Sequence, residues 1–138
     1  MEKKPMFTAL HAGLSVYSME KSFDWYEKNL NFHLKRDDGF CPPLDARVCF
    51  LEGEDGFILE LFEYKEPKKI PQDRLEPSTD LMTVGTKHIA FQVRDMSEVK
   101  ERFLSNKVDI VLETEMGREK VMFVRDCNGI LVELMEFN

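Results

Sequence analysis

The sequence lacks the features that mark several large classes of protein. No apolar run approaches the roughly 18 residues that a membrane-spanning helix requires, and the start, Met1-Glu-Lys-Lys-Pro, lacks the apolar stretch of a secretory signal peptide. The 19 Lys and Arg residues are scattered among 26 Asp and Glu residues and form no basic face. We therefore expect neither a membrane nor a nucleic acid as a partner.

Cysteine is scarce, and phosphate-binding and nucleophile motifs are missing. The three cysteines, Cys41, Cys49 and Cys127, have no metal or redox spacing and are typical of reduced thiols in a cytoplasmic protein. No glycine-rich phosphate loop and no Ser/His/Asp order is present. What is present is 138 residues, 43% of them hydrophobic, with a formal net charge of -7. This is enough for one acidic domain with its own core.

The chain contains an internal repeat. Residues 11–19 (HAGLSVYSM) match residues 88–96 (HIAFQVRDM) at an offset of 77, and residues 56–63 (GFILELFE) match 129–136 (GILVELME) at an offset of 73. Two matches in the same order and at nearly the same spacing indicate two copies of one module.

Each copy predicts the element order β-α-β-β-β. Alternation of apolar and polar residues predicts first strands over 9–17 and 87–93. Helices are expected over 20–30, capped by Ser18 or Ser22, and over 98–105, capped by Ser97 with Phe103 and Leu104 facing inward. Three shorter strands follow in each copy: 32–37, 46–52 and 57–64, then 108–114, 120–125 and 130–136. The turns 54–56 and 126–129 join the last two strands of each copy as hairpins.

The predicted fold is α+β, with two tandem βαβββ modules forming a concave mixed sheet and helices on its outer face. We expect a single domain over 1–138, with module one at about 8–64 and module two at about 87–138. Residues 65–86 carry three prolines among charged residues, so this connector is expected to have little regular structure.

Four polar residues are expected on the face opposite the helices. His11 and His88 lie on the first strands, Glu60 and Glu133 on the last strands, and their neighbours on that face are small or apolar. Unpaired carboxylates in such surroundings are costly. Two neutral imidazoles and two carboxylates would bind a divalent cation with room for two more ligands. A single such His or Glu is more often solvated surface, and the recurrence in both copies favours the metal site.

The other polar residues of these strands have simpler interpretations. Glu63 and Glu136 also recur, but alternation places them on the helix side or at the strand end, where a solvated or capping role is expected. His33 has no partner in the second copy and is interpreted as structural. Trp25 and Tyr26 are expected in the core on the inner face of the first helix.

The repeat and its motifs resemble the vicinal oxygen chelate superfamily, the group of glyoxalase I, bleomycin-resistance proteins, methylmalonyl-CoA epimerase and extradiol dioxygenases. The resemblance covers about residues 8–137. It is carried by the following motifs: His11-Ala-Gly-Leu-Ser-Val, Phe23-Asp-Trp-Tyr, Leu59-Glu-Leu-Phe-Glu, Gly85-Thr-Lys-His-Ile-Ala-Phe-Gln-Val and Asn128-Gly-Ile-Leu-Val-Glu-Leu. It implies a sheet that cups a divalent metal, and a homodimer whose site combines one module from each of two chains.

The resemblance implies one metal per site, with His11, Glu60, His88 and Glu133 on the four ligand positions of glyoxalase I. The full set favours the lactoylglutathione lyase-like branch. Bleomycin-resistance proteins do not keep it, dioxygenases and fosfomycin-type transferases lack a carboxylate at the position of Glu60, and the epimerase has Gln there. The choice among Ni, Co, Zn, Mn and Fe is left open, because an N₂O₂ ligand set does not decide it.

Two positions depart from the glutathione-type enzyme. Ser15 replaces an Arg that helps to bind a glutathione carboxylate, and Tyr64 replaces an Asn. Losing the Arg removes a charge-assisted anchor, so the substrate and the use of glutathione are left open. Ser15, Tyr64, Arg118 and Lys120 are the candidate substrate-binding residues.

The leading hypothesis is a divalent-metal-dependent isomerase or lyase of the glyoxalase I type. It would stabilise an enediolate of a small oxo substrate, with Glu133 and Glu60 as the catalytic carboxylates. The first alternative is an iron-dependent ring-cleaving-type dioxygenase with His11, His88 and Glu133 as ligands. The second is a metal-free, resistance-type protein that binds a small ligand without chemistry.

Overall fold

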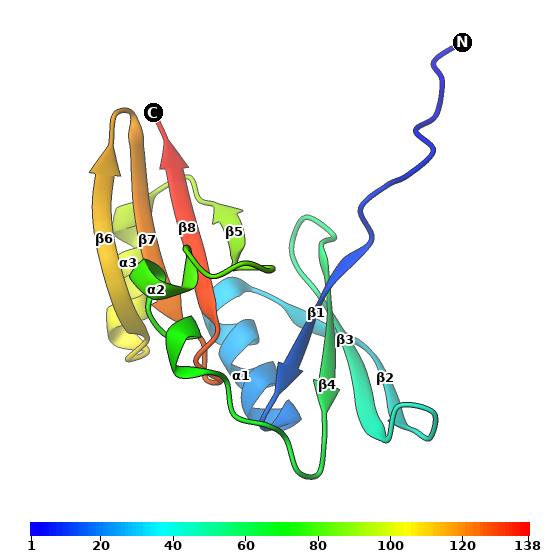
Figure 1. The fold of residues 1–138 in the computed structure, drawn as a ribbon. Helices are drawn as coiled ribbons and strands as arrows, with labels where there is room; N and C mark the ends of the chain where they lie inside the picture. The colour runs from blue at the N-terminus through cyan, green and yellow to red at the C-terminus, as the bar shows by residue number, and fades with distance from the viewer. The chain divides into compact units, whose positions relative to one another are not determined.

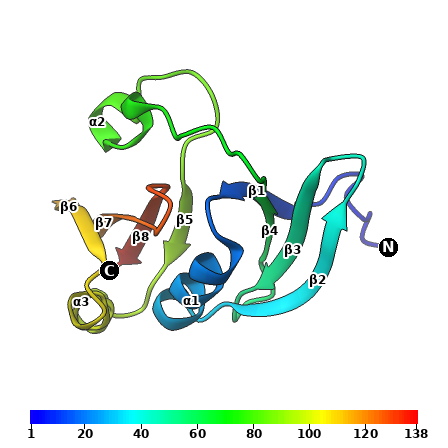
Figure 2. The ribbon, with the colours of Figure 1, turned by 90° about the horizontal axis from the view of Figure 1, so that it is seen from below.

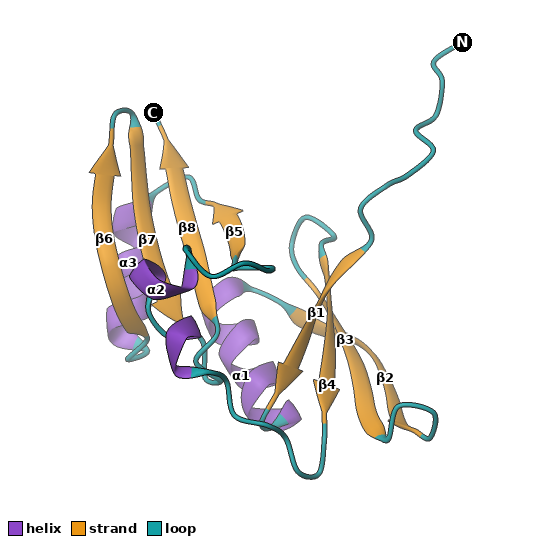
Figure 3. Ribbon diagram, in the orientation of Figure 1, coloured by secondary structure: helices purple, strands orange, loops and turns teal.

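A computed structural model describes residues 1–138 as two compact units, Met1–Pro67 and Lys68–Asn138. Each unit contains one four-stranded mixed sheet. The strands and helices are labelled in Figure 1, and Figure 3 distinguishes them from the loops by colour.

The first unit is a βαβββ module. Its elements are β1 (His11–Val16), α1 (Met19–Leu30), β2 (His33–Cys41), β3 (Ala46–Glu52) and β4 (Ile58–Glu63). The strand order is β1-β4-β3-β2, which can be followed in Figure 2. β1 and β4 are parallel, and the other neighbours are antiparallel. The first and last strands of the module are therefore hydrogen-bonded to each other.

The second unit repeats this topology after two short helical turns. Its elements are η1 (Gln72–Arg74), α2 (Pro77–Asp80), β5 (Ile89–Gln92), α3 (Met96–Ser105), β6 (Asp109–Met116), β7 (Glu119–Arg125) and β8 (Leu131–Phe137). The strand order is β5-β8-β7-β6, with β5 and β8 parallel. The predicted α+β fold with two tandem βαβββ modules is confirmed.

Most predicted boundaries are correct to within two residues, and the second strand of the first module is the main exception. β2 runs to Cys41 rather than to 37, because its turn to β3 lies at residues 42–45. Two register shifts within β2 accommodate extra residues and interrupt the alternation of side chains along this strand.

The predicted cap of the second helix is wrong. α3 begins at Met96, and Asp95 rather than Ser97 is its N-cap, with its carboxylate accepting hydrogen bonds from the backbone N–H groups of Ser97 and Glu98. Leu104 was expected to face inward but is exposed, because the buried positions of the earlier-starting helix are Met96 and Phe103. In α1, Ser18 is the N-cap, and Trp25 and Tyr26 are buried as expected.

One face of each sheet forms an apolar core with its helix. α1 packs against β4, and α3 packs against β8. The fully buried strand residues recur at the offset of 73: Cys49 and Met122, Leu51 and Val124, Leu59 and Val132, Leu61 and Leu134. Burial of such side chains is the main stabilising contribution. The helix face of each sheet is thus fixed, and the alternate residues of the same strands must lie on the opposite face.

The three cysteines are free thiols, as expected. Cys49 is fully buried among the apolar residues of the first core. Burial, together with a hydrogen bond to Asp37, raises the pKa of the Cys49 thiol to about 12. Cys49 is therefore a protonated packing residue with no nucleophilic role.

Glu63 and Glu136 bind the N-termini of the two helices. The backbone N–H of Met19 donates to Glu63 Oε2 at 2.6 Å, and that of Met96 donates to Glu136 Oε1 at 2.8 Å. A carboxylate at a helix N-terminus satisfies a free N–H and interacts favourably with the helix dipole. Strand alternation predicted a solvated or a capping role for these two residues, and the structure shows the capping role.

The last two strands of each module are joined by matching turns. Gly56 and Gly129 have φ values of 88° and 89°, in the left-handed region that favours glycine. The carboxylates of Asp55 and Asp126 accept backbone hydrogen bonds within these turns. The turns fix the register of the final hairpin in each module.

The connector has little regular structure, as expected. Between β4 and β5 only η1 and α2 are helical, with three and four residues, and the rest is loop in Figure 3. None of the helices in the chain is long and apolar enough to span a membrane.

The cap at α1 gives a stability prediction. Replacing Glu63 with Ala leaves the N–H of Met19 without its acceptor and should lower the free energy of unfolding by about 1 kcal/mol. Urea unfolding followed by circular dichroism measures the change. Glu66→Ala, which removes an exposed carboxylate that makes no ion pair, is the matched control. Equal stability of the Glu63 variant and the control would contradict the capping role.

Candidate metal-binding half-sites

The first module brings His11 and Glu60 together. In the parallel β1–β4 pair, Glu60 lies opposite Gly13, two residues beyond His11 on the same face. The Nε2 atom of His11 is 3.6 Å from Oε2 of Glu60, and the two side chains are 31% and 19% exposed. Gly13 has no side chain, and the Phe62 ring lies 3.4 Å from where its Cβ would be.

The second module repeats this arrangement with His88 and Glu133. Glu133 lies opposite Ala90, again two residues beyond the histidine. The Nε2 atom of His88 is 3.7 Å from Oε2 of Glu133, with side chains 18% and 15% exposed. The two modules therefore present the same pair of groups in the same register, next to a small residue.

A phenylalanine ring adjoins each histidine. Phe50 lies opposite Glu60 on β3, and its ring is edge-on to His11 with centroids 6.3 Å apart. Phe123 holds the equivalent place on β7, with its centroid 5.0 Å from that of His88. Sequence reasoning missed both residues, although their offset of 73 is the same as that of Glu60 and Glu133. Each half-site is thus a His–Glu–Phe group.

The four polar side chains make no hydrogen bonds within the chain. Both His–Glu distances exceed hydrogen-bond length, and Nδ1 of His88 is buried without a partner. Mostly buried carboxylates and imidazoles are normally hydrogen-bonded. Their bonding capacity is therefore unused by the protein itself.

The donor groups fit a divalent cation. Two donors that are each about 2.1 Å from one cation lie roughly 3.0 to 3.4 Å apart, and the observed distances of 3.6 and 3.7 Å are slightly longer. Imidazole nitrogen and carboxylate oxygen suit Zn, Fe, Ni and Mn. The chain contains no group of three or more His, Cys, Asp or Glu side chains arranged around one point. Each module therefore supplies a half-site of two donors.

The other predicted site residues lie at different places. Ser15 lies on β1, four residues beyond His11 and on the same face of the sheet. Tyr64 is exposed and directly follows the end of β4. Arg118 is exposed in the turn between β6 and β7, where its carbonyl accepts a hydrogen bond from the backbone of Asn138.

Lys120 lies away from Glu133. It is opposite Glu136 on β8, on the helix face, and its Nζ is 3.6 Å from the carboxylate that caps α3. The structure therefore separates Lys120 from the face that carries His88 and Glu133.

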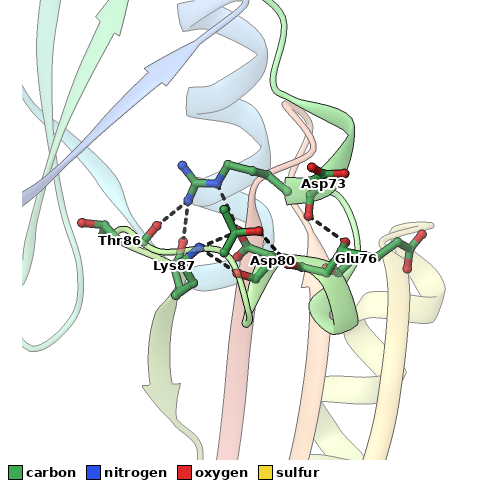
Figure 4. A network of polar contacts seen from close by, with 8 residues as sticks. Asp73, Glu76, Asp80, Thr86 and Lys87 are labelled. Carbon is green, nitrogen blue, oxygen red and sulfur yellow. Dashed lines mark hydrogen bonds and ion pairs between the residues drawn. The ribbon is translucent and has the colours of Figure 1, made fainter.

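A buried ionic network anchors the chain directly before His88. Asp80 is buried, and its Oδ1 is 3.1 Å from Arg74 Nε and 3.2 Å from Lys87 Nζ. Arg74 also donates to the carbonyls of Thr86 and Lys87, and Lys87 Nζ donates to the Asp80 carbonyl. Figure 4 shows Asp80, Thr86 and Lys87 converging in this network. The backbone that leads into His88 is thus held by the connector.

The first module has no such anchor. Residues 1–10, which lead into His11, are exposed throughout and contain no helix or strand, as the loop colour in Figure 3 shows. His11 is accordingly more exposed than His88. The second half-site is the better fixed of the two.

The chain belongs to the Glyoxalase/Bleomycin resistance protein/Dioxygenase superfamily, whose family model matches residues 8–134. The resemblance noted from the motifs is confirmed. A search of curated proteins gives no match.

Solved structures show the same fold. A glyoxylase/bleomycin resistance protein/dioxygenase domain from Frankia sp. EAN1pec has a TM-score of 0.77 at 19% identity, covering 97% of this chain and 94% of that one. The trypanothione-dependent glyoxalase I of Leishmania major has a TM-score of 0.72 at 23% identity, with 97% and 87% covered.

A third similar structure contains a bound metal ion. The fosfomycin resistance protein FosX from Listeria monocytogenes, complexed with Mn(II) and 1S,2S-dihydroxypropylphosphonic acid, has a TM-score of 0.68 at 19% identity, with 94% of this chain and 92% of that one covered. The TM-scores, over nearly the whole of this chain, establish the shared fold. A proposal for the activity of this chain must therefore be argued from its own residues.

The network before His88 gives a second prediction. Asp80→Asn should lower the free energy of unfolding by about 2 kcal/mol, because two partly buried cations lose their counter-charge. In nuclear magnetic resonance spectra, the substitution should change the ring chemical shifts of His88 more than those of His11 or His33. Asp73→Asn, also in the connector but exposed, is the control. Unchanged His88 signals in Asp80→Asn would contradict the anchoring role.

Proposed function

We propose that the protein is a divalent-metal-dependent isomerase or lyase of the glyoxalase I type, acting on a small substrate with two adjacent oxygens. The ligands are His11, Glu60, His88 and Glu133. One observation carries the proposal: both modules hold a His–Glu pair in the same strand register, without any hydrogen bond from the protein.

Charge and coordination number support the use of both pairs. Two carboxylates balance the charge of one divalent cation, and each half-site alone has too few donors for the four to six ligands that such cations take. One cation would therefore be bound by a His11–Glu60 pair together with a His88–Glu133 pair. The family resemblance supports a homodimer, in which the two pairs come from different chains.

The catalytic part of the proposal assigns proton transfer to the glutamates. A bound metal would act as a Lewis acid that stabilises the enediolate form of the substrate. Glu133 removes the proton from the carbon next to the carbonyl and returns it to the neighbouring carbon. Glu133 lies opposite Ala90, a residue with a short side chain, in the β5–β8 pair. Glu60, beside Gly13, has the equivalent place on the other module.

The equivalence of Glu60 and Glu133 separates this proposal from an iron dioxygenase. That alternative uses His11, His88 and Glu133 and gives Glu60 no role, whereas Glu60 lies at the same distance from its histidine as Glu133 does. A metal-free binding protein would have no need for either pair. The recurring pairs therefore favour the isomerase.

Turnover of 2-oxoaldehydes, free and as thiol adducts, by metal-loaded protein tests the proposal. Glu133→Gln should lower kcat by at least about a hundredfold, since the amide cannot accept the proton, while the metal is still bound, though more weakly. Glu101→Gln, on the exposed side of α3, is the control and should keep full activity.

Full activity in Glu133→Gln would contradict the role of this residue as the base. Oxygen uptake that depends on Fe(II), without any isomerase activity, would instead support the dioxygenase.

A further inference from the structure

Arg36 occupies the same row of the first sheet as the ligand Glu60. Across the four strands, the residues of this row are Gly13, Glu60, Phe50 and Arg36, each opposite the next. The Arg36 guanidinium carbon is 4.4 Å from the centroid of the Phe50 ring, and this ring is edge-on to His11. A cation therefore lies on the face that carries the first half-site, with one aromatic ring between it and the histidine.

The second module has an apolar residue at this place. Its row is Ala90, Glu133, Phe123 and Leu112. A register shift directly precedes Arg36 in β2 and Leu112 in β6. The backbones of β2 and β6 are therefore alike at this place, and only the side chains differ. Common folding requirements would explain a feature shared by both modules. They do not explain a charge present in only one of them.

The guanidinium has hydrogen-bonding capacity to spare. Nε and Nη2 donate to Asp38 at 2.6 and 3.2 Å, and Nη1 makes no hydrogen bond within the chain. The Arg36 side chain is 63% exposed, so its pair with Asp38 is screened by water and contributes little. Arginine presents five N–H donors in a fixed plane and can bind a second carboxylate without losing the first.

We propose that Arg36, stacked on Phe50, binds an anionic group of the substrate. The inference rests on the proposed function, because it is the substrate at the metal that brings this group to Arg36. The substrate class is then a small molecule with two adjacent oxygens at one end and an oxyanion, such as a carboxylate, at the other. The Phe50 ring contacts the carbon chain between the two ends.

The test compares two sets of 2-oxo acids as ligands of the Mn(II)-loaded protein. 2-Oxoglutarate, 2-oxoadipate and 2-oxopimelate carry a distal carboxylate, and 2-oxopentanoate, 2-oxohexanoate and 2-oxoheptanoate are their apolar-ended counterparts. Isothermal titration gives each Kd. At least one member of the first set should bind about tenfold more tightly than its counterpart, the size expected of one exposed charge-assisted contact.

Arg36→Gln should remove this preference while the apolar-ended acids and Mn(II) itself bind as before. Lys28→Gln, which makes the same charge change on α1, is the matched control and should keep the preference. A preference that survives in Arg36→Gln, or no preference in the wild type, would overturn the inference and leave the metal site intact. Failure of the wild type to bind Mn(II) would instead overturn the proposed function and this inference with it.

Discussion

The parallel pairing of the first and last strands in each module is the constraint on which the site depends. It brings residues that are 49 and 45 positions apart in the sequence into contact, His11 with Glu60 and His88 with Glu133. The apolar residues Leu59, Leu61, Val132 and Leu134 are fully buried under the helices. Because a slip by one residue would turn these side chains outward, the core itself fixes the register that joins histidine to glutamate.

The helix caps tie the same strands to the helices. Glu63 ends β4 and Glu136 lies near the end of β8, and each binds the first N–H of the helix in its own module. Both β4 and β8 thus carry one glutamate on the face opposite the helix and a second glutamate that binds the helix N-terminus. This division of roles follows from strand alternation, because 60 and 63, like 133 and 136, differ by an odd number.

The fold and the His–Glu pairs could be predicted from the sequence because they depend on local patterns that occur twice. Alternation and the two offsets identified the strands and the four candidate ligands. Phe50 and Phe123 could have been found by the same offset, since their pairing with the glutamates follows from the final hairpins.

Other features depend on tertiary contacts or on irregular pairing. Arg36 faces Phe50 only because a register shift interrupts β2, and alternation alone does not reveal where a strand contains an extra residue. Asp80 gains its two cationic partners through the folding of the connector. Ser97 and Asp95 are both good N-caps, and the choice depends on where the helix begins.

The two half-sites differ in how firmly their backbone is held and in which residues adjoin them. The backbone before His88 is held by a buried ionic network, and His88 is well shielded. His11 follows an exposed segment, and its neighbourhood carries Arg36 where the second module has Leu112. Under the proposed function both pairs bind the metal, and Arg36 beside the first pair adds a contact for a charged substrate.

The central claim is that both His–Glu pairs bind one metal ion. Elemental analysis of the purified protein after dialysis, beside His11→Ala and His88→Ala, tests it most directly. The account predicts about one divalent metal per chain in the wild type and a similar loss in both variants, since each module supplies half of the ligands. Metal that remains bound when either histidine is replaced, or a wild type that takes up none after reconstitution, would contradict it.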